Sequence, residues 1–258
     1  MNEIQSCFER YEKKYLLTRE QYLAVKSGMA AYMKPDGHPR YTICNVYYDT
    51  ENYDLIRASL EKPVYKEKLR LRSYGTAKDD TTSFIEIKKK FMGVVYKRRI
   101  SMPYSEAVDY LINHKEPKEK SQISNEIDYF LKYYKGLAPA MVISYDRIAM
   151  VGINDPELRI TFDTNIRWRA DKLSLKEGNA GHEILLPGQH LMELKIAGAM
   201  STELAKMLDE LNIRKVSFSK YGRGYLEYMY GQTSEMASKG IVPKKEDKSK
   251  IVALRRAV

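Results

Sequence analysis

Residues 68–74 read KLRLRSY, and this stretch decides the fold that we expect for the whole chain. Side chains alternate between the two faces of a β-strand, so one face of this stretch carries Lys68, Arg70 and Arg72. The opposite face carries Leu69 and Leu71, which can pack into an apolar core. The pattern therefore predicts a half-buried strand with a strongly basic second face.

Six further stretches alternate charged residues with aliphatic or aromatic ones. They are RYEKKYL (10–16), FIEIKKK (84–90), VVYKRRI (94–100), VISYDRIAMV (142–151), LRITFDTNIRW (158–168) and HLMELKIAG (190–198). Each alternation taken alone is equally well explained by a sheet whose polar face meets water. Together, however, the charged faces hold many more cations than carboxylates, and like charges opposite one another destabilise a sheet by roughly 0.2–1 kcal/mol per pair. The combined pattern indicates that the shared face binds an anion.

The overall charge supports this interpretation. The 258 residues carry a net charge of +10 with a pI near 9.3, which favours nucleic acid, a phosphorylated small molecule, polyphosphate or an acidic membrane as partner.

Cys7 and Cys44 are the only cysteines, so neither a disulfide framework nor a thiolate zinc site is expected. No apolar run approaches the ~20 residues that a membrane-spanning helix needs. We therefore expect a cytoplasmic protein, with peripheral attachment to a membrane as an alternative.

The chain is expected to form one domain over residues 1–235, followed by a basic, flexible tail over residues 236–258. Strand patterns cover eight segments: 10–16, 43–50, 64–74, 83–90, 93–102, 142–151, 158–168 and 190–198. Helical spacing is found at 19–33, 104–135 and 202–231, with candidate N-caps at Thr18, Ser105, Ser124 and Ser219. This succession predicts an α+β fold in which eight antiparallel strands close into a barrel surrounded by helices.

A closed barrel would confine the basic face in a space of low dielectric constant. Desolvation there costs several kcal/mol per ion unless counter-charges are present, and a chain of phosphates supplies them. Arg binds phosphate oxygens in a bidentate way and Lys contributes a compact point charge, so the two together suit a linear polyanion. Isolated carboxylates beside phosphates form an oxygen-rich site that suits Mg²⁺ or Mn²⁺.

Nine ordered blocks of the sequence resemble one known family. They read RYEKKY, NVYYDTENYDLI, KLRLRSYG, FIEIKKK, VYKRRI, SYDRIA, LRITFDTNI, MELK and FSKYGRG. In this order they are similar to the VTC domain of the vacuolar transporter chaperone polyphosphate polymerases, from about residue 8 to about residue 230. That family is a branch of the triphosphate tunnel metalloenzymes. The resemblance implies a barrel whose basic interior binds phosphate, with Mn²⁺ or Mg²⁺ beside one carboxylate.

The resemblance also implies roles for individual residues. Those that would align the reacting phosphates are Arg70, Arg72, Lys88, Arg147, Arg159 and Lys195. Those that would contact phosphate elsewhere in the tunnel are Lys14, Lys97, Ser219 and Lys220, to which the shared charged faces add Arg10 and Lys68. Glu193 would hold the metal ion. Ser219 has independent support, because the first residues of a helix present free N–H groups to anions.

The first strand departs from the hydrolytic branch of the tunnel enzymes. It reads RxExK, with Arg10 in place of one glutamate of the ExExK pattern. The strand therefore offers fewer carboxylate ligands to a metal ion, which favours the polymerase branch. We expect Glu12 and Glu86 to form ion pairs with neighbouring lysines rather than to bind metal. The resulting hypothesis is a polyphosphate polymerase that transfers the γ-phosphoryl group of ATP to a growing inorganic polyphosphate chain.

Two other functions are left open by the sequence. A metal-dependent tripolyphosphatase would use water as the acceptor in the same tunnel, and a polyphosphate-binding module would keep the tunnel without turnover. Nucleic-acid binding is disfavoured, because the 21 tyrosines fall mostly at apolar positions where core packing explains them. The expected partners are thus ATP and inorganic polyphosphate, with an integral membrane protein as a further candidate. The sequence leaves the oligomeric state open.

Overall fold

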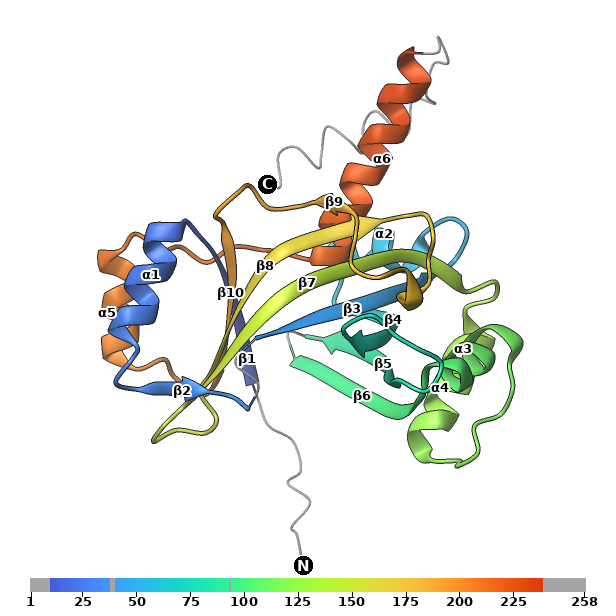
Figure 1. Cartoon of the computed structure of the whole chain (residues 1–258), viewed down its shortest axis with the longest axis horizontal. Helices are drawn as coiled ribbons and strands as arrows, with labels where there is room; N and C mark the ends of the chain where they lie inside the picture. The colour runs from blue at the N-terminus through green and yellow to red at the C-terminus, as the bar shows by residue number, and fades with distance from the viewer. Residues whose placement is uncertain (1–9, 38–39, 93, 239–258) are drawn as a thin grey trace, which may run out of the picture.

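The computed structural model describes residues 10–37, 40–92 and 94–238 (Figure 1). The strands in this part of the chain are β1 (Arg10–Leu17), β2 (Met33–Pro35), β3 (Tyr41–Asp49), β4 (Tyr65–Tyr74), β5 (Thr82–Phe91), β6 (Val94–Pro103), β7 (Ala138–Gly152), β8 (Arg159–Arg169), β9 (His182–Glu183) and β10 (His190–Ala197). The helices are α1 (Arg19–Gly28), α2 (Asp54–Leu60), α3 (Tyr104–Asn113), α4 (Gln122–Tyr133), α5 (Thr202–Glu210) and α6 (Lys220–Ser238), with a 3₁₀ turn at Leu175–Glu177.

All strands belong to one antiparallel sheet. Its order is β1-β10-β8-β7-β3-β4-β5-β6, while β2 pairs with β7 and β9 pairs with β8. The eight strands on this path are the eight that the sequence predicted, and the α+β class is confirmed. The short strands β2 and β9 were not predicted, because two or three residues are too few to show an alternation.

The expected barrel is wrong in one respect, because the sheet is curled but not closed. Within the described residues no ladder joins β1 to β6, the two ends of the strand order. Four strands separate β1 from β4 in that order, and about 4.8 Å per step would put them roughly 24 Å apart in a flat sheet. Yet Lys14 Nζ on β1 donates to the carbonyl of Phe218 (2.8 Å), and Lys68 Nζ on β4 donates to Oγ of the next residue, Ser219 (3.2 Å). Strands β1 and β4 thus reach adjacent residues of the chain, which they could not do in a flat sheet. The sheet is therefore curled into a tube that stays open along one side.

The open seam between β1 and β6 is bridged by an ion pair. Lys88 Nζ on β5 lies 3.1 Å from Glu12 Oε2 on β1. Lys88 and Lys97 each keep 37% of their side-chain surface exposed, so solvent reaches the charged face at this seam.

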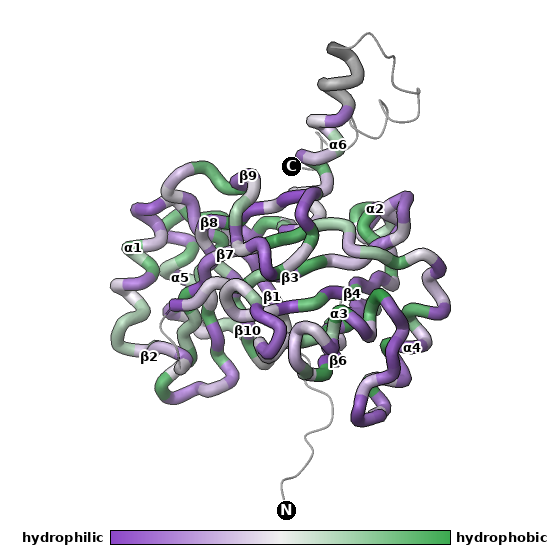
Figure 2. Tube along the Cα trace, turned by 45° about the vertical axis from the view of Figure 1, so that its right-hand side comes forward, coloured by the Kyte–Doolittle hydropathy of each residue, from purple (hydrophilic) through white to green (hydrophobic). Residues whose placement is uncertain are grey.

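Helices cover both faces of the curled sheet (Figure 1). α1 and α5 pack on the apolar outer face of β1, β8 and β10, and α3 and α4 pack on the outer face of β4–β6. Leu69 and Leu71 are 0% and 1% exposed beneath α3 and α4, as the KLRLRSY pattern predicted. Figure 2 shows the contrast between hydrophobic segments along β7 and β8 and the mostly hydrophilic loop beside α4.

α6 packs on the inner face of the tube, against β7 and β8. Its Tyr221 and Tyr225 join Met141, Ile143 and Trp168 in one buried cluster. Met141 and Ile143 alternate with the residues of the outer face, so they lie on the same side of β7 as Arg147. The helix thereby fills one end of the tube and brings its first residue, Lys220, to the charged face.

Local signals predicted some helix starts and missed others. Thr18 caps α1 through a reciprocal bond with Gln21, as expected. The caps predicted at Ser105 and Ser124 are wrong: Pro103 precedes α3, and Ser121 caps α4 with Ser124 as its partner in the capping box. α2 was not predicted, because seven residues are too few to reveal helical spacing.

The last helix, α6, continues to Ser238. Residues 239–258, which make up most of the predicted tail, lie outside the described residues, so the expected boundary at residue 235 stays a prediction. None of the helices in the described part of the chain has both the length and the apolar composition needed to cross a bilayer.

Candidate functional site

Strand register gathers the predicted cations into rows on the inner face. Lys68 on β4 lies opposite Lys88 on β5, which lies opposite Lys97 on β6. In the next row Arg70 lies opposite Glu86. The period of two keeps these residues on one side of three neighbouring strands, as the sequence predicted.

Glu86 is the centre of the first ionic cluster. Its side chain is 1% exposed, and its carboxylate lies 2.7 Å from Arg70 Nη2 and 2.6 Å from Lys97 Nζ, with Arg72 Nε at 3.7 Å. Burial alone would raise the pKa of Glu86, but the charges of these three residues outweigh it and hold the pKa at about 2. Glu86 therefore pairs with cations, as expected.

Asp163 is the centre of a second cluster, which joins β7 to α6. Arg147 binds it in a bidentate way (Nε–Oδ1 2.6 Å, Nη2–Oδ2 2.8 Å), and Lys220 Nζ lies 2.6 Å from Oδ2. Burial would raise the pKa of Asp163, but Lys220 and Arg147 lower it. Asp163 alternates with Ile160 and Phe162 in the stretch 158–168, yet nothing in the sequence indicated that this carboxylate would hold Arg147 and Lys220 together.

Glu193 and Glu12 form a third cluster, at the junction of β1 and β10. Lys195 Nζ lies 3.7 Å from Glu193 Oε1 and 4.0 Å from Glu12 Oε1. Glu12 is also paired with Lys88, which confirms the expected ion pair. Burial would raise the pKa of Glu193, but Lys14 and Lys195 are the largest of several charges that hold it well below the usual range.

The oxygen donors around Glu193 are few, and they would fit only a divalent cation that other ligands help to hold. The described residues contain no group of three or more His, Cys, Asp or Glu side chains placed to bind a metal ion. Thr161 lies directly opposite Glu193, and its buried Oγ1 has no hydrogen-bond partner. Mg²⁺ commonly uses one or two carboxylates together with substrate phosphates, so a single carboxylate such as Glu193 is compatible with a site of that kind.

Three lysines of the site have lowered pKa values. Burial, followed by the charges of Lys14, Lys66 and other cations, lowers the pKa of Lys68 to about 7. Burial also lowers the pKa of Lys14 and of Lys97, each to about 8, although Glu193 and Glu86 respectively oppose the effect. Burial is the largest cause for all three lysines, so an anion bound beside them would favour their charged forms.

Two buried tyrosines support the paired arginines. Arg70 Nη1 donates to the hydroxyl of Tyr47 (3.1 Å), and Arg72 Nη2 donates to that of Tyr145 (3.4 Å). Burial would raise the pKa of Tyr145, but Arg72 and other neighbouring cations lower it to about 8. Neither tyrosine was predicted as a site residue. Tyr145 carried a usable signal, because it lies two residues before Arg147 and thus on the same face.

The start of α6 is anchored by Asp49 at the end of β3. Asp49 accepts hydrogen bonds from the backbone N–H groups of Leu55 (2.9 Å) and Ile56 (3.0 Å) in α2, and from the hydroxyl of Tyr221 (2.9 Å). Tyr221 follows Lys220, and the Ser219 hydroxyl caps the helix by accepting from the N–H of Gly222 (3.1 Å). The predicted cap at Ser219 is therefore confirmed.

One predicted residue, Arg159, stands apart from these clusters, and the side chain of another, Arg10, is not described. Arg159 on β8 lies directly opposite Lys195 on β10. Its side chain is 51% exposed, however, and its Nη1 lies 3.4 Å from Asp36 Oδ2, so Arg159 lies at the rim of the tube. Arg10 pairs with Ala197 through the backbone of β1, and its side chain lies outside the described structure. The other predicted site residues lie on the charged face or at the start of α6.

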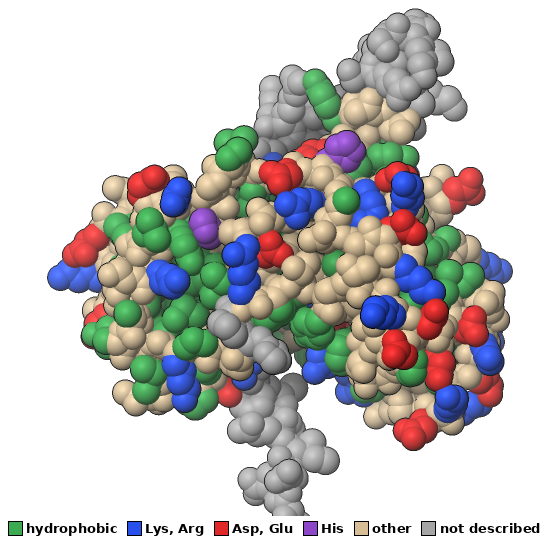
Figure 3. Space-filling model, in the orientation of Figure 1, with side chains coloured by type: hydrophobic (Ala, Val, Ile, Leu, Met, Phe, Trp, Pro, Cys, Tyr) green, Lys and Arg blue, Asp and Glu red, His purple; other side chains and the backbone are tan. Residues whose placement is uncertain are grey.

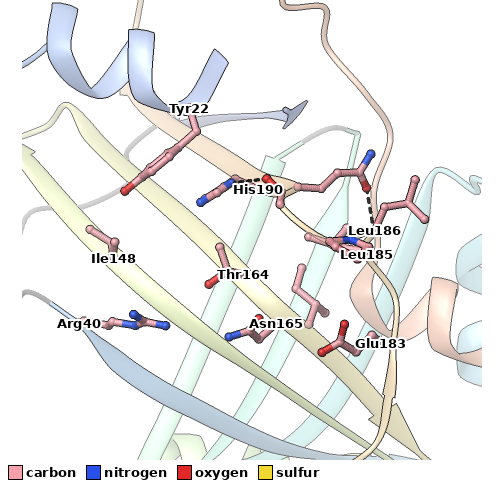
Figure 4. Close-up of a pocket in the computed structure, with 13 residues that line it drawn as sticks. Tyr22, Arg40, Ile148, Thr164, Asn165, Glu183, Leu185, Leu186 and His190 are labelled. Atoms are coloured by element: carbon pink, nitrogen blue, oxygen red, sulfur yellow. Dashed lines mark hydrogen bonds between the residues drawn. The ribbon is translucent and has the colours of Figure 1, made fainter. Parts of the chain in front are cut away.

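The outer surface of the molecule carries charges of both signs, unlike the mostly basic inner face. Figure 3 shows Lys, Arg, Asp and Glu side chains interspersed on the visible outer surface. A separate cavity of about 320 Å³ lies beside α1, where Tyr22 stacks on His190 at 3.9 Å and Arg40 and Glu183 contribute charge (Figure 4). None of the residues that line this cavity belongs to the three ionic clusters.

Comparison with known proteins identifies relatives. The family model of the VTC domain matches residues 9–229. A solved candidate adenylate cyclase from Bacillus halodurans is similar over 82% of this chain and 95% of its own, with 15% identity and a TM-score of 0.51, which shows a shared fold. A candidate adenylyl cyclase from Hippeastrum, described as having a dominant triphosphatase activity, covers 84% of this chain and 95% of its own, with 14% identity and a TM-score of 0.49. No curated protein matches the chain significantly.

Proposed function

The chain belongs to the VTC domain family, and from this premise we propose that it is a polyphosphate polymerase. It would transfer the γ-phosphoryl group of ATP to the end of a growing inorganic polyphosphate chain and release ADP. Lys and Arg side chains on the inner face would bind donor and acceptor phosphates in one line. The protein would need no nucleophilic side chain, because the terminal phosphate of the acceptor attacks.

The observation that carries this proposal is the surplus of cations on the inner face. The carboxylates there are Glu12, Glu86, Asp163 and Glu193. The cations that they face, or that lie in the same rows, are Lys14, Lys68, Arg70, Arg72, Lys88, Lys97, Arg147, Lys195 and Lys220. When every lysine is protonated, the nine cations exceed the four carboxylates by five charges, and a buried surplus of this kind is stabilised by a polyanion.

The geometry suits phosphoryl transfer by positioning and charge neutralisation. Arg70, Arg72 and Arg147 are held by Glu86, Asn45 and Asp163, so each guanidinium is oriented before the substrate arrives. Such preorganisation aligns reactants and spreads the charge that develops on the transferred group. Lys195 would contact the end of the triphosphate that carries the metal ion. Lys14 and Lys220 would contact phosphates near the start of α6. We propose Arg159 as a contact for phosphates at the rim.

A divalent cation, Mn²⁺ or Mg²⁺, would be held by Glu193. When bound, it would neutralise charge on the triphosphate and help to fix its orientation. Lys14 and Lys195 flank this carboxylate and keep it ionised, so it is ready to bind a cation. Glu12 is already committed to Lys88, which leaves Glu193 as the carboxylate for the metal.

The decisive experiment is product analysis with the purified protein. With ATP and Mn²⁺ we expect acid-labile polymers on a polyphosphate gel, accompanied by one ADP for each phosphate added. A variant with Arg70→Gln and Arg72→Gln should form no polymer, whereas Arg98→Gln, which removes a cation from the outer face of β6, should keep the activity. Orthophosphate as the only product would show a tripolyphosphatase, and polyphosphate binding without ATP consumption would show a binding module.

Binding should also depend on pH in a defined direction. The free site holds Lys68 with a pKa of about 7, and a bound phosphate raises that pKa by favouring the charged form. Binding therefore takes up a proton, and affinity should fall as pH rises from about 7 toward the pKa of the bound form. We expect tripolyphosphate to bind more weakly at pH 8.5 than at pH 6.5, measured by titration calorimetry.

A Lys68→Arg variant separates this effect from titration of the ligand. Arginine stays charged throughout this range, so the fall in affinity should be smaller in the variant than in the parent protein. An identical pH dependence in the two proteins would contradict a role for Lys68 in proton uptake.

A further inference from the structure

The charged face continues one row beyond the residues assigned so far. Lys66 on β4 lies directly opposite Lys90 on β5, and each is two residues from the row of Lys68 and Lys88. Two residues along a strand keep a side chain on the same face and advance it by about 7 Å. The row of Lys66 and Lys90 is therefore a direct continuation of the phosphate-binding face.

This added row contains no counter-charge. Neither Lys66 nor Lys90 forms an ion pair with a carboxylate in the described part of the chain, and Lys66 Nζ instead donates to the Ser59 carbonyl (3.1 Å). Burial, together with the charges of Lys90 and Lys62, lowers the pKa of Lys66. Like charges directly opposite one another across a ladder are unfavourable, so an anion bound between them would relieve the repulsion.

The opposite end of the same strands has a different character. There the inner face carries Tyr74 and Phe84, whose ring centroids lie 5.8 Å apart, and Tyr41 packs on Tyr74 at 5.5 Å. Arg99 lies over the Phe84 ring at 4.9 Å. The rows of lysine thus lie toward one end of β4 and β5, and aromatic rings lie toward the other. The two ends of the inner face therefore differ in chemistry.

We propose that Lys66 and Lys90 bind the distal phosphates of a polyphosphate chain that extends past the row of Lys68, Lys88 and Lys97. The proposal rests on the proposed function for the identity of its ligand. An orthophosphate ion is too small to bridge two rows about 7 Å apart, whereas a linear polyanion can contact both. The added row therefore makes the site favour long chains over short ones.

The test compares two ligands and two double variants. The Lys66→Gln, Lys90→Gln variant is expected to bind long-chain polyphosphate roughly tenfold more weakly, because it lacks two charge-assisted contacts. Its affinity for tripolyphosphate should stay within about twofold, because the rows that bind the shorter ligand are intact. The matched control is Lys89→Gln, Lys132→Gln, which removes one charge from the outer face of β5 and one from α4 and should leave both affinities unchanged.

Each other outcome has a definite meaning. Unchanged long-chain affinity in the Lys66→Gln, Lys90→Gln variant would overturn this inference, and so would an equal loss for both ligands or an equal loss in the control. These outcomes leave the proposed function standing as long as the parent protein binds both ligands. Failure of the parent protein to bind either ligand would instead overturn the proposed function together with this inference.

Discussion

A Glu193→Gln substitution is expected to lower turnover by roughly 100-fold or more while polyphosphate stays bound at least as tightly as in the parent protein. The carboxylate would hold the divalent cation, and neutralising it removes the only protein ligand that we assign to the metal. The same change removes a negative charge beside Lys14 and Lys195, so a polyanion meets a more positive site.

The measurement is polymer formation as a function of Mn²⁺ concentration, with polyphosphate affinity determined separately without metal. Glu12→Gln is the matched control, because Glu12 lies beside Lys195 but is paired with Lys88. It should impair turnover less than Glu193→Gln and leave the Mn²⁺ dependence near that of the parent protein. Full activity of the Glu193→Gln variant would remove Glu193 from the metal site, and an equal shift in Mn²⁺ dependence in both variants would show that the two carboxylates share it.

A Glu86→Gln substitution is expected to destabilise the free protein strongly and to make its stability depend on phosphate. Glu86 is 1% exposed and compensates Arg70, Arg72 and Lys97. Removing one partner of a buried ion pair costs about 3–5 kcal/mol, since the remaining charges are left uncompensated. For a domain of this size that corresponds to a fall in Tm of roughly 6–20 °C.

Tripolyphosphate should restore much of this loss, because its charges replace the missing carboxylate and the variant binds it more tightly. The readout is the rise in Tm with added tripolyphosphate, which should be larger in Glu86→Gln than in the parent protein. Glu126→Gln is the control: Glu126 pairs with Arg98 at 3.1 Å but is 28% exposed, so its loss should cost less than about 1 kcal/mol. A Glu86→Gln protein as stable as its parent, or one that tripolyphosphate stabilises no further, would contradict the role of Glu86 as a built-in counter-ion.

Much of the inner face was predictable from local pattern. Strand alternation alone placed Lys68, Arg70 and Arg72 on one side and buried Leu69 and Leu71 on the other. The resemblance to a family added residues whose position no alternation indicates, such as Ser219, and the structure confirms the helix cap expected there. Arg159 shows the limit of both approaches, since its place on the charged face was expected but its exposure and its contact with Asp36 were not.

The sequence by itself determined which residues share a face, because side-chain direction in a strand depends only on a period of two. Only the tertiary structure decided which of them meet across the tube. Lys14 and Lys68 reach neighbouring residues, and Arg147 and Lys220 share Asp163, because the sheet curls and α6 packs inside it. The ion pair between Lys88 and Glu12 likewise forms only because the sheet curls and brings β5 to β1. Contacts between residues distant in the sequence arise from packing of the whole domain, and no local pattern contains that information.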